Sequence, residues 1–311
     1  MLHEALYKDV PLILTLTMAP ATRRMAARSG AVTLGRTIQM SRWHRLTAND
    51  VRRYLVQRTV HRPGLSRAVQ LACCYLALDR WVALLSAPYV IMRDRRRKST
   101  SSQLLVAEVH RFGPEVDMLW QRSNMDYPAI CPRNSVFLNW RFVDCPRLHY
   151  RRFIAYRDGQ AVGYSILRHT EAEELRLGII IDVFAARRDH AVFERLISHA
   201  IDHFGGQVAS VECGTSIPEV EKVLRSEGFH ITRILAPTVV TSNDALRKEV
   251  ASLRDSWFLS KADHDWDQIH LGRSPSPFGK HPARAGEGRG LSGSGDGLLH
   301  FRISTSPDVQ S

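Results

Sequence analysis

Apolar and polar positions between residues 150 and 240 follow two alternating periods, one typical of strands and the other typical of helices. The strand-like runs are residues 152–157, 161–168, 177–184, 208–213 and 231–240. The helical runs are residues 193–204 and 217–224. The run at 177–184 is almost continuously apolar, which is typical of a strand buried on both faces. This order predicts an α/β fold.

Short polar and glycine-containing sequences mark the ends of these runs. Asp158-Gly159 lies between the first two strands and favours a tight hairpin turn, because both residues accept positive φ. Gly205 follows the first helix and is expected to end it. Ser216 and Glu219 have the spacing of a capping box, which predicts the start of the second helix.

The flanking sequence extends this domain in both directions. Residues 104–112 are strand-like, and helices are predicted at 114–122, 135–142 and 243–253. From residue 272 onward, Gly, Ser and Pro dominate and apolar periodicity ends. Such a composition buries too little apolar surface to offset the entropy of ordering, so residues 272–311 are expected to be a disordered tail.

Two local motifs accompany this order of elements. One is Arg133-Asn134 followed by FLNWRF at 137–142, and the other is the helix exit EGF at 227–229. Together they resemble the GNAT superfamily of acyl-CoA-dependent N-acyltransferases, and in particular the GNAT-like domains of bacterial tandem proteins. The resemblance implies a mixed central sheet flanked by helices for residues 103–271.

The front of the chain contains a faint copy of a later segment. Pro20 aligns with Pro218 and Gly30 with Gly228, both at an offset of 198 residues. This match has two interpretations: a partial second GNAT-like copy, or a coincidence between two short βαβ segments.

The rest of the front is helical in pattern over residues 44–92. Residues 1–92 are therefore expected to be the partial copy plus helices. The basic, Ser-rich residues 93–102 are expected to be a linker to the GNAT-like domain.

The resemblance implies acetyl-CoA as co-substrate, held where the buried strand meets the next helix. In the family, a glycine-containing loop there offers backbone N–H groups to the pyrophosphate. The matching residues 185–191 contain no glycine, and Asp189 also suits a helix N-cap. The implied cofactor-binding residues are Val183, Phe184, Ala185, Arg187 and Arg188.

The implied reaction is acetyl transfer from acetyl-CoA to a small-molecule or peptide amine. Glu212 and Asp182 are the candidate general bases, although a carboxylate at a strand edge is more often a solvated charge. Many family members have a tyrosine acid where this chain has Leu224, and leucine transfers no proton. The alternative is a non-catalytic GNAT-like scaffold or partner-binding domain.

The net charge of +12 is concentrated in residues 1–110, which contain 18 Lys+Arg against 6 Asp+Glu. This basic block predicts weak, non-specific polyanion binding, because no sequence motif typical of specific nucleic-acid recognition accompanies it. No metal site is expected: the D-x-D-x-D run that begins at Asp263 lacks the glycine of a calcium loop.

Five cysteines without a CxxC pair favour a reduced, cytoplasmic protein. Residues 71–92 are apolar, but Asp79-Arg80 lies near the middle of the run. Charges at that depth of a bilayer are costly, so no membrane span is expected.

Overall fold

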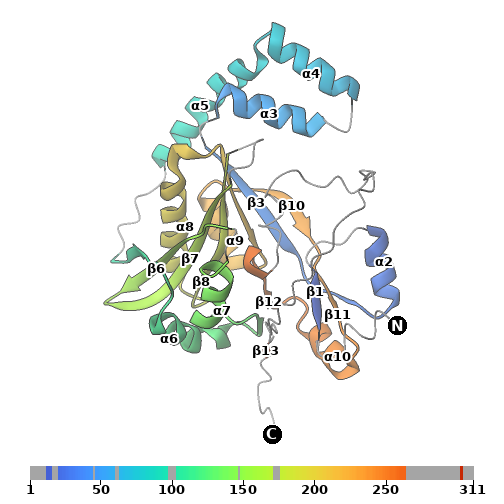
Figure 1. Ribbon diagram of the computed structural model, residues 1–311, viewed down its shortest axis with the longest axis vertical. Coiled ribbons are helices and arrows are strands. Elements are labelled where there is room, and N and C mark those ends of the chain that lie inside the picture. Colours follow the sequence, from blue (N-terminus) through green and yellow to red (C-terminus); the bar gives the residue numbers. More distant parts are fainter. Residues whose placement is uncertain are drawn as a thin grey trace, which may run out of the picture.

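The computed structural model describes residues 12–15, 20–44, 46–59, 63–96, 103–145, 148–170, 176–263 and 302–303. Within these residues, a seven-stranded sheet has the order β10-β3-β9-β8-β7-β6-β4 (Figure 1). Its strands are β3 (Thr37–Trp43), β4 (Leu105–Glu108), β6 (Arg151–Arg157), β7 (Gln160–Thr170), β8 (Leu177–Ala185), β9 (Ser210–Thr215) and β10 (His230–Leu235). Only β8 and β9 are parallel neighbours there. The prediction of an α/β fold with a mixed sheet flanked by helices is confirmed.

Helices cover both faces of this sheet. The helices that follow residue 110 are α6 (Pro114–Ser123), α7 (Ser135–Phe142), α8 (His190–Phe204), α9 (Pro218–Ser226) and α10 (Asp244–Ser252). On β7, a Cβ at Gly163 would touch Val192 and Leu196 of α8, whereas the next residue, Tyr164, packs on Phe184. Phe184 also contacts Trp120 of α6. Because successive strand residues face opposite sides, α8 and α6 lie on opposite faces of the sheet.

Strands from the front of the chain complete the sheets of its second half. β3 lies between β10 and β9 in the central sheet. A smaller sheet places β11 (Thr238–Val240) between β1 (Ile13–Thr15) and β2 (Val32–Thr33), which flank α2 (Pro20–Arg28). Residues 1–92 were expected to precede the GNAT-like domain, whereas β3 lies inside its sheet.

A third small sheet joins distant parts of the chain. β5 (Ala129–Ile130) pairs with β12 (Trp257–Phe258) and with β13 (Arg302–Ile303). These last two residues belong to the segment expected to be a disordered tail, and there the structure differs from that expectation. The rest of residues 272–311 lies outside the described part of the chain.

Most of the predicted turn signals are confirmed, and one is wrong. Asp158 and Gly159 have φ of 50° and 76°, and Gly205 has φ of 46° after α8. The capping box is not formed: the N-cap of α9 is Ile217, without a side-chain cap. The Ser216 hydroxyl instead donates to the Trp257 carbonyl and accepts from the Leu259 N–H, because a later segment lies against it.

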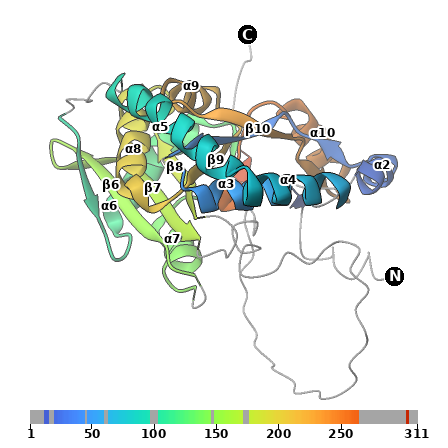
Figure 2. The ribbon, with the colours of Figure 1, turned by 90° about the horizontal axis from the view of Figure 1, so that it is seen from above.

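Three further helices stand beside the central sheet: α3 (Ala48–Thr59), α4 (Pro63–Tyr75) and α5 (Leu78–Arg96) (Figures 1 and 2). The end of α5 is held to β3 by the ion pair of Arg42 with Asp94 at 2.6 Å. Arg93 also donates to the Trp43 carbonyl at 2.7 Å. In the described residues, no single helix has the length and apolarity to cross a membrane, but Gly64–Tyr75 and Leu78–Asp94, bent by 78°, meet that criterion together.

A cluster of histidines lies where α8 covers β6 and β7. The His199 ring lies 6.2 Å from that of His203, which lies 5.8 Å from that of His169. Phe153 and Phe204 pack against the same rings. Burial lowers the pKa of all three histidines, and neighbouring positive charges lower it further.

This cluster predicts a loss of stability in mild acid. The unfolded chain binds protons at these rings below about pH 6.5, whereas the folded chain resists them, so stability falls as the pH falls through that value. The charged groups around the rings are Glu108, Arg151, Arg195 and Asp202. A His199→Gln/His203→Gln variant should show a shallower drop in melting temperature between pH 7.5 and 5. The exposed His190, replaced by Gln, is the control, and equal slopes in all three proteins would contradict the assignment.

Candidate functional site

Strands β8 and β9 pair over only part of their lengths. Their parallel pairing extends from Leu177 opposite Ser210 to Ile180 opposite Cys213. Thr215, at the end of β9, pairs with Ser260 instead of with β8. Ser260 in turn donates a hydrogen bond to Asp182 of β8 at 2.7 Å. A carboxy-terminal piece of the chain therefore lies between the diverging ends of the two strands.

We call this piece, Trp257 to Asp263, the plug segment. Its side chains are almost fully buried: Phe258 is 2% exposed and Leu259 is 1% exposed. The Phe258 ring packs edge-on against Tyr127 and Phe184, with centroids 4.9 and 6.0 Å away. The segment is thus part of the hydrophobic core around the end of β8.

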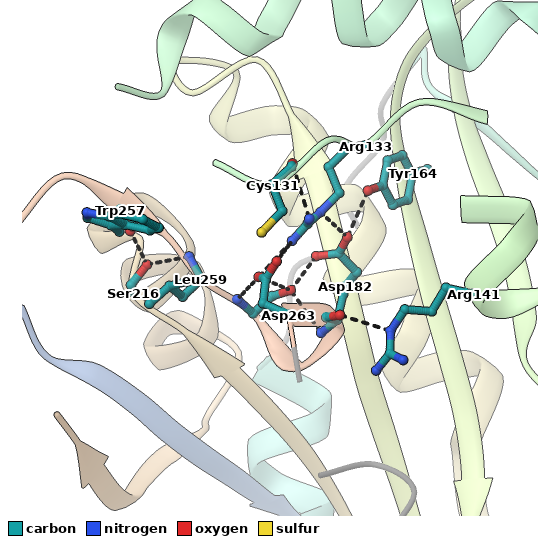
Figure 3. Close-up of polar contacts among 11 residues, drawn as sticks. Cys131, Arg133, Arg141, Tyr164, Asp182, Ser216, Trp257, Leu259 and Asp263 are labelled. Atoms are coloured by element: carbon teal, nitrogen blue, oxygen red, sulfur yellow. Dashed lines mark hydrogen bonds and ion pairs between the residues drawn. The ribbon is translucent and has the colours of Figure 1, made fainter. Parts of the chain in front are cut away.

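A buried ion network joins the plug segment to β8 (Figure 3). The Arg133 guanidinium is fully buried and lies 2.9 Å from a carboxylate oxygen of Asp182 and 2.7 Å from one of Asp263. Tyr164 donates its hydroxyl to Asp182 at 2.8 Å. Removing charges from water is costly, so such a network persists only where each charge has close partners.

The two candidate catalytic carboxylates both contact this segment. Asp182 is buried against Arg133 and Ser260, and burial raises its pKa while Arg133 opposes the rise. Glu212, on β9, is half-buried and forms an ion pair with Lys261 at 3.3 Å. The register places Glu212 opposite Ile179, three residues before Asp182. The structure therefore does not bring the two carboxylates together as a pair that faces open space.

The residues expected to hold the thioester are core residues. Phe184 and Ala185 are fully buried, and Val183 is 5% exposed. The Ala185 carbonyl accepts the hydroxyl of Tyr127 at 2.8 Å, and burial strongly raises the pKa of that tyrosine. Phe184 lies under Phe258 of the plug segment.

The start of α8, where the pyrophosphate was expected, carries a carboxylate of the chain itself. Asp189 is the N-cap and accepts the Val192 N–H. The same carboxylate forms two bonds with Arg157, at 2.8 and 3.1 Å. An anion that approached this helix end would meet a negative charge already in place.

The two arginines expected to bind phosphates have different surroundings. The Nε of Arg187 donates a hydrogen bond to Glu219 of α9 at 3.0 Å, and the backbone N–H of Arg187 donates one to the Asp126 carboxylate. Arg188 is exposed. The residues present therefore do not fit a pyrophosphate group: one arginine is engaged with a carboxylate, and the helix end is capped.

The cap yields a direct prediction. Replacing Asp189 with Ala should lower the free energy of unfolding by about 1–2 kcal/mol, because the first N–H groups of α8 lose their acceptor. Replacing Arg157 with Ala removes the partly exposed ion pair but keeps the cap, so it should cost about 1 kcal/mol or less. Urea unfolding of both variants measures the difference, and a larger loss in the Arg157 variant would contradict the assigned cap.

Other reactive groups near this site are buried. Cys213 is fully buried, and burial raises its pKa to about 12. Burial also raises the pKa of Cys131 well above its ordinary value. Neither thiol is a nucleophile at neutral pH, since the thiolate is the reactive form. The described residues hold no cluster of three potential metal ligands.

The sequence predicts β8 and the loop that follows it, but not the buried ion network. In the sequence, Arg133 is part of a family-like motif and Asp263 is the first residue of an acidic run. Their contact joins residues 130 positions apart, which no local period can reveal. One signal was available: an arginine and an aspartate each placed beside apolar runs that are expected to be buried.

No protein-family model matches the sequence, and no curated protein matches it. Among solved structures, the chain is similar to a GCN5-related N-acetyltransferase from Anabaena variabilis, with a TM-score of 0.47 and 12% identity over 80% of this chain and 50% of that chain. It is also similar to a GCN5-related N-acetyltransferase from Kribbella flavida, with a TM-score of 0.40 and 11% identity over 80% of this chain and 47% of that chain. The chain thus spans about half the length of these two proteins. A conserved protein of unknown function from Staphylococcus epidermidis gives a TM-score of 0.40 and 8% identity, with 77% and 75% of the two chains covered.

Proposed function

We propose that this chain is a non-catalytic GNAT-like domain that binds a partner and does not transfer acyl groups. The observation that supports the proposal is the plug segment between β8 and β9. Ser260 and Lys261, adjacent residues of this segment, contact the two candidate catalytic carboxylates, Asp182 and Glu212. The place implied for the thioester is thus filled by side chains of the chain itself.

Displacing the plug segment would be costly. It would expose the buried Phe258 and Leu259 and separate Asp263 from Arg133. Separating one partner from a buried ion pair typically costs about 3–5 kcal/mol, and binding of a small ligand would have to supply that free energy first. Acetyl transfer from acetyl-CoA to a small-molecule or peptide amine, the competing function, requires this opening.

A thiol-release assay separates the two functions. The full chain is mixed with acetyl-CoA and a panel of small-molecule and peptide amines, and free CoA is followed with a thiol reagent. We expect no amine-dependent release above the rate without protein. Amine-dependent turnover by the parent chain would overturn the proposal, and its loss in the Glu212→Gln variant would show a working base at β9.

A further inference from the structure

Helices α4 and α5 carry most of the exposed large apolar side chains of the described chain. Within the residues that the structure describes, twenty large apolar side chains are exposed, and twelve of them lie on or between these two helices. The six most exposed of them are Tyr75, Leu76, Trp81, Leu84, Leu85 and Tyr89, each between 59% and 83% exposed. We call the exposed side of α4 and α5 the apolar hairpin surface.

This surface has the composition of a helix pair in contact with lipid. Along α5, the described side chains that are buried are Asp79 and Val90, and apolar residues occupy most of the remaining positions. Between Trp81 and Met92 of α5, Ser86 is the only polar residue, and a helical segment that is apolar on every side normally lies in a protein core or in a membrane. Here the segment lies above the ends of the strands of the central sheet in Figure 1, so the exposed apolar side chains need a binding partner that accepts them.

The geometry excludes a simple membrane crossing for this pair as it stands. α4 and α5 meet at 78°, with Ala77 at φ 51° in the bend. At that bend Asp79 is 2% exposed and forms an ion pair with Arg52 of α3 at 2.8 Å. Straightening the pair would break this contact and carry an aspartate into the bilayer. The hairpin surface is therefore suited to lie on a membrane and not to cross it.

The charge around this surface favours anionic lipid over a second copy of the chain as its binding partner. Residues 44–98 contain twelve arginines and lysines against three aspartates, a net charge of +9. Arg67 and Arg80 are exposed on the two helices themselves. In a symmetric dimer the same surface of both copies is in contact, which would bring two of these positively charged blocks together. Anionic lipid headgroups attract the same block.

We propose that the apolar hairpin surface binds the surface of an anionic lipid membrane. Leu84 and Leu85 enter the upper acyl region, Trp81 lies at the headgroup level, and Arg67 and Arg80 contact phosphate groups. Binding of this kind needs both the apolar and the basic contribution, since either alone gives marginal attachment. The proposal does not depend on whether the central domain transfers acyl groups.

Flotation with lipid vesicles tests this. The full chain is mixed with vesicles of phosphatidylcholine alone and of phosphatidylcholine with about one third phosphatidylglycerol. We expect flotation with the anionic vesicles only, and a strong decrease between 50 and 500 mM salt. Flotation that is equal on both vesicle types, or absent from both, overturns the proposal.

Matched variants identify the surface. Leu84→Ser/Leu85→Ser and Arg67→Glu/Arg80→Glu should each lower the fraction bound by about tenfold or more. Met118→Ser/Val136→Ser, which changes two exposed apolar side chains on α6 and α7, should bind as the parent chain does. Circular dichroism confirms that each variant is folded. Unchanged binding in the leucine variant, or a concentration-dependent dimer that only this variant loses, would assign the surface to another partner and contradict the proposal.

Discussion

Replacing Arg133 with Met is expected to lower the free energy of unfolding by about 3–5 kcal/mol. The side chain is fully buried between Asp182 and Asp263, whose carboxylates are also fully buried. Methionine fills a similar volume but leaves two carboxylates without their counter-charge. Breaking a buried ion pair on one side costs more than the pair itself contributes, because the remaining charge is uncompensated.

The control is an ion pair of similar length on the surface. Arg111 and Asp144 approach to 2.7 Å, but both side chains are at least half exposed. Arg111→Met should leave the urea midpoint nearly unchanged, since water replaces the lost contact. A triple variant, Arg133→Met with Asp182→Asn and Asp263→Asn, should recover part of the loss. Equal midpoints for the Arg133 and Arg111 variants would show that the network is not buried as described.

Removal of the plug segment is the second change for which we expect a large loss of folding stability. A chain that ends at Ser256 loses the buried Trp257, Phe258 and Leu259 and also the Asp263 partner of Arg133. Each large core side chain typically contributes about 3–5 kcal/mol, so the loss exceeds the whole stability of an ordinary domain. We expect this chain to show no cooperative thermal transition.

A longer truncation variant provides the comparison. A chain that ends at residue 271 keeps the plug segment and loses β13, which pairs through only Arg302 and Ile303. It should melt within a few degrees of the full chain. If the chain that ends at Ser256 melted at the same temperature as the longer one, the plug segment would not belong to the core.

The order of elements in the second half of the chain could be predicted because its signals are local. The apolar run of β8, the Asp158-Gly159 turn and the periodicity of α8 each report on a few neighbouring residues. The pairing of β3 with β9 and β10 could not be predicted in this way. It joins residues about 170 and 190 positions apart, and nothing in the local pattern of 37–43 specifies its neighbours.

In the candidate site, too, features set by neighbouring residues could be predicted and features set by distant segments could not. The absence of glycine from 185–191 and the capping role of Asp189 followed from single residues, and the structure has that cap. The capping box of Ser216 failed because a distant segment supplies better partners for its hydroxyl. The sequence of the plug segment, Trp257 to Asp263, has no period that predicts where it packs. Its insertion between β8 and β9 depends on contacts with residues that are far away in the sequence.

Calorimetric titration of the full chain with acetyl-CoA tests the proposal that side chains of the chain itself fill the place implied for acyl-CoA. We expect no binding tighter than a high-micromolar dissociation constant, about −5 to −6 kcal/mol. Whatever heat remains should be the same for the Arg188→Ala variant, because the pyrophosphate place at α8 is capped by Asp189. Low-micromolar binding that Arg187→Ala/Arg188→Ala abolishes would overturn this proposal, since it would place the cofactor where the plug segment and the cap now lie.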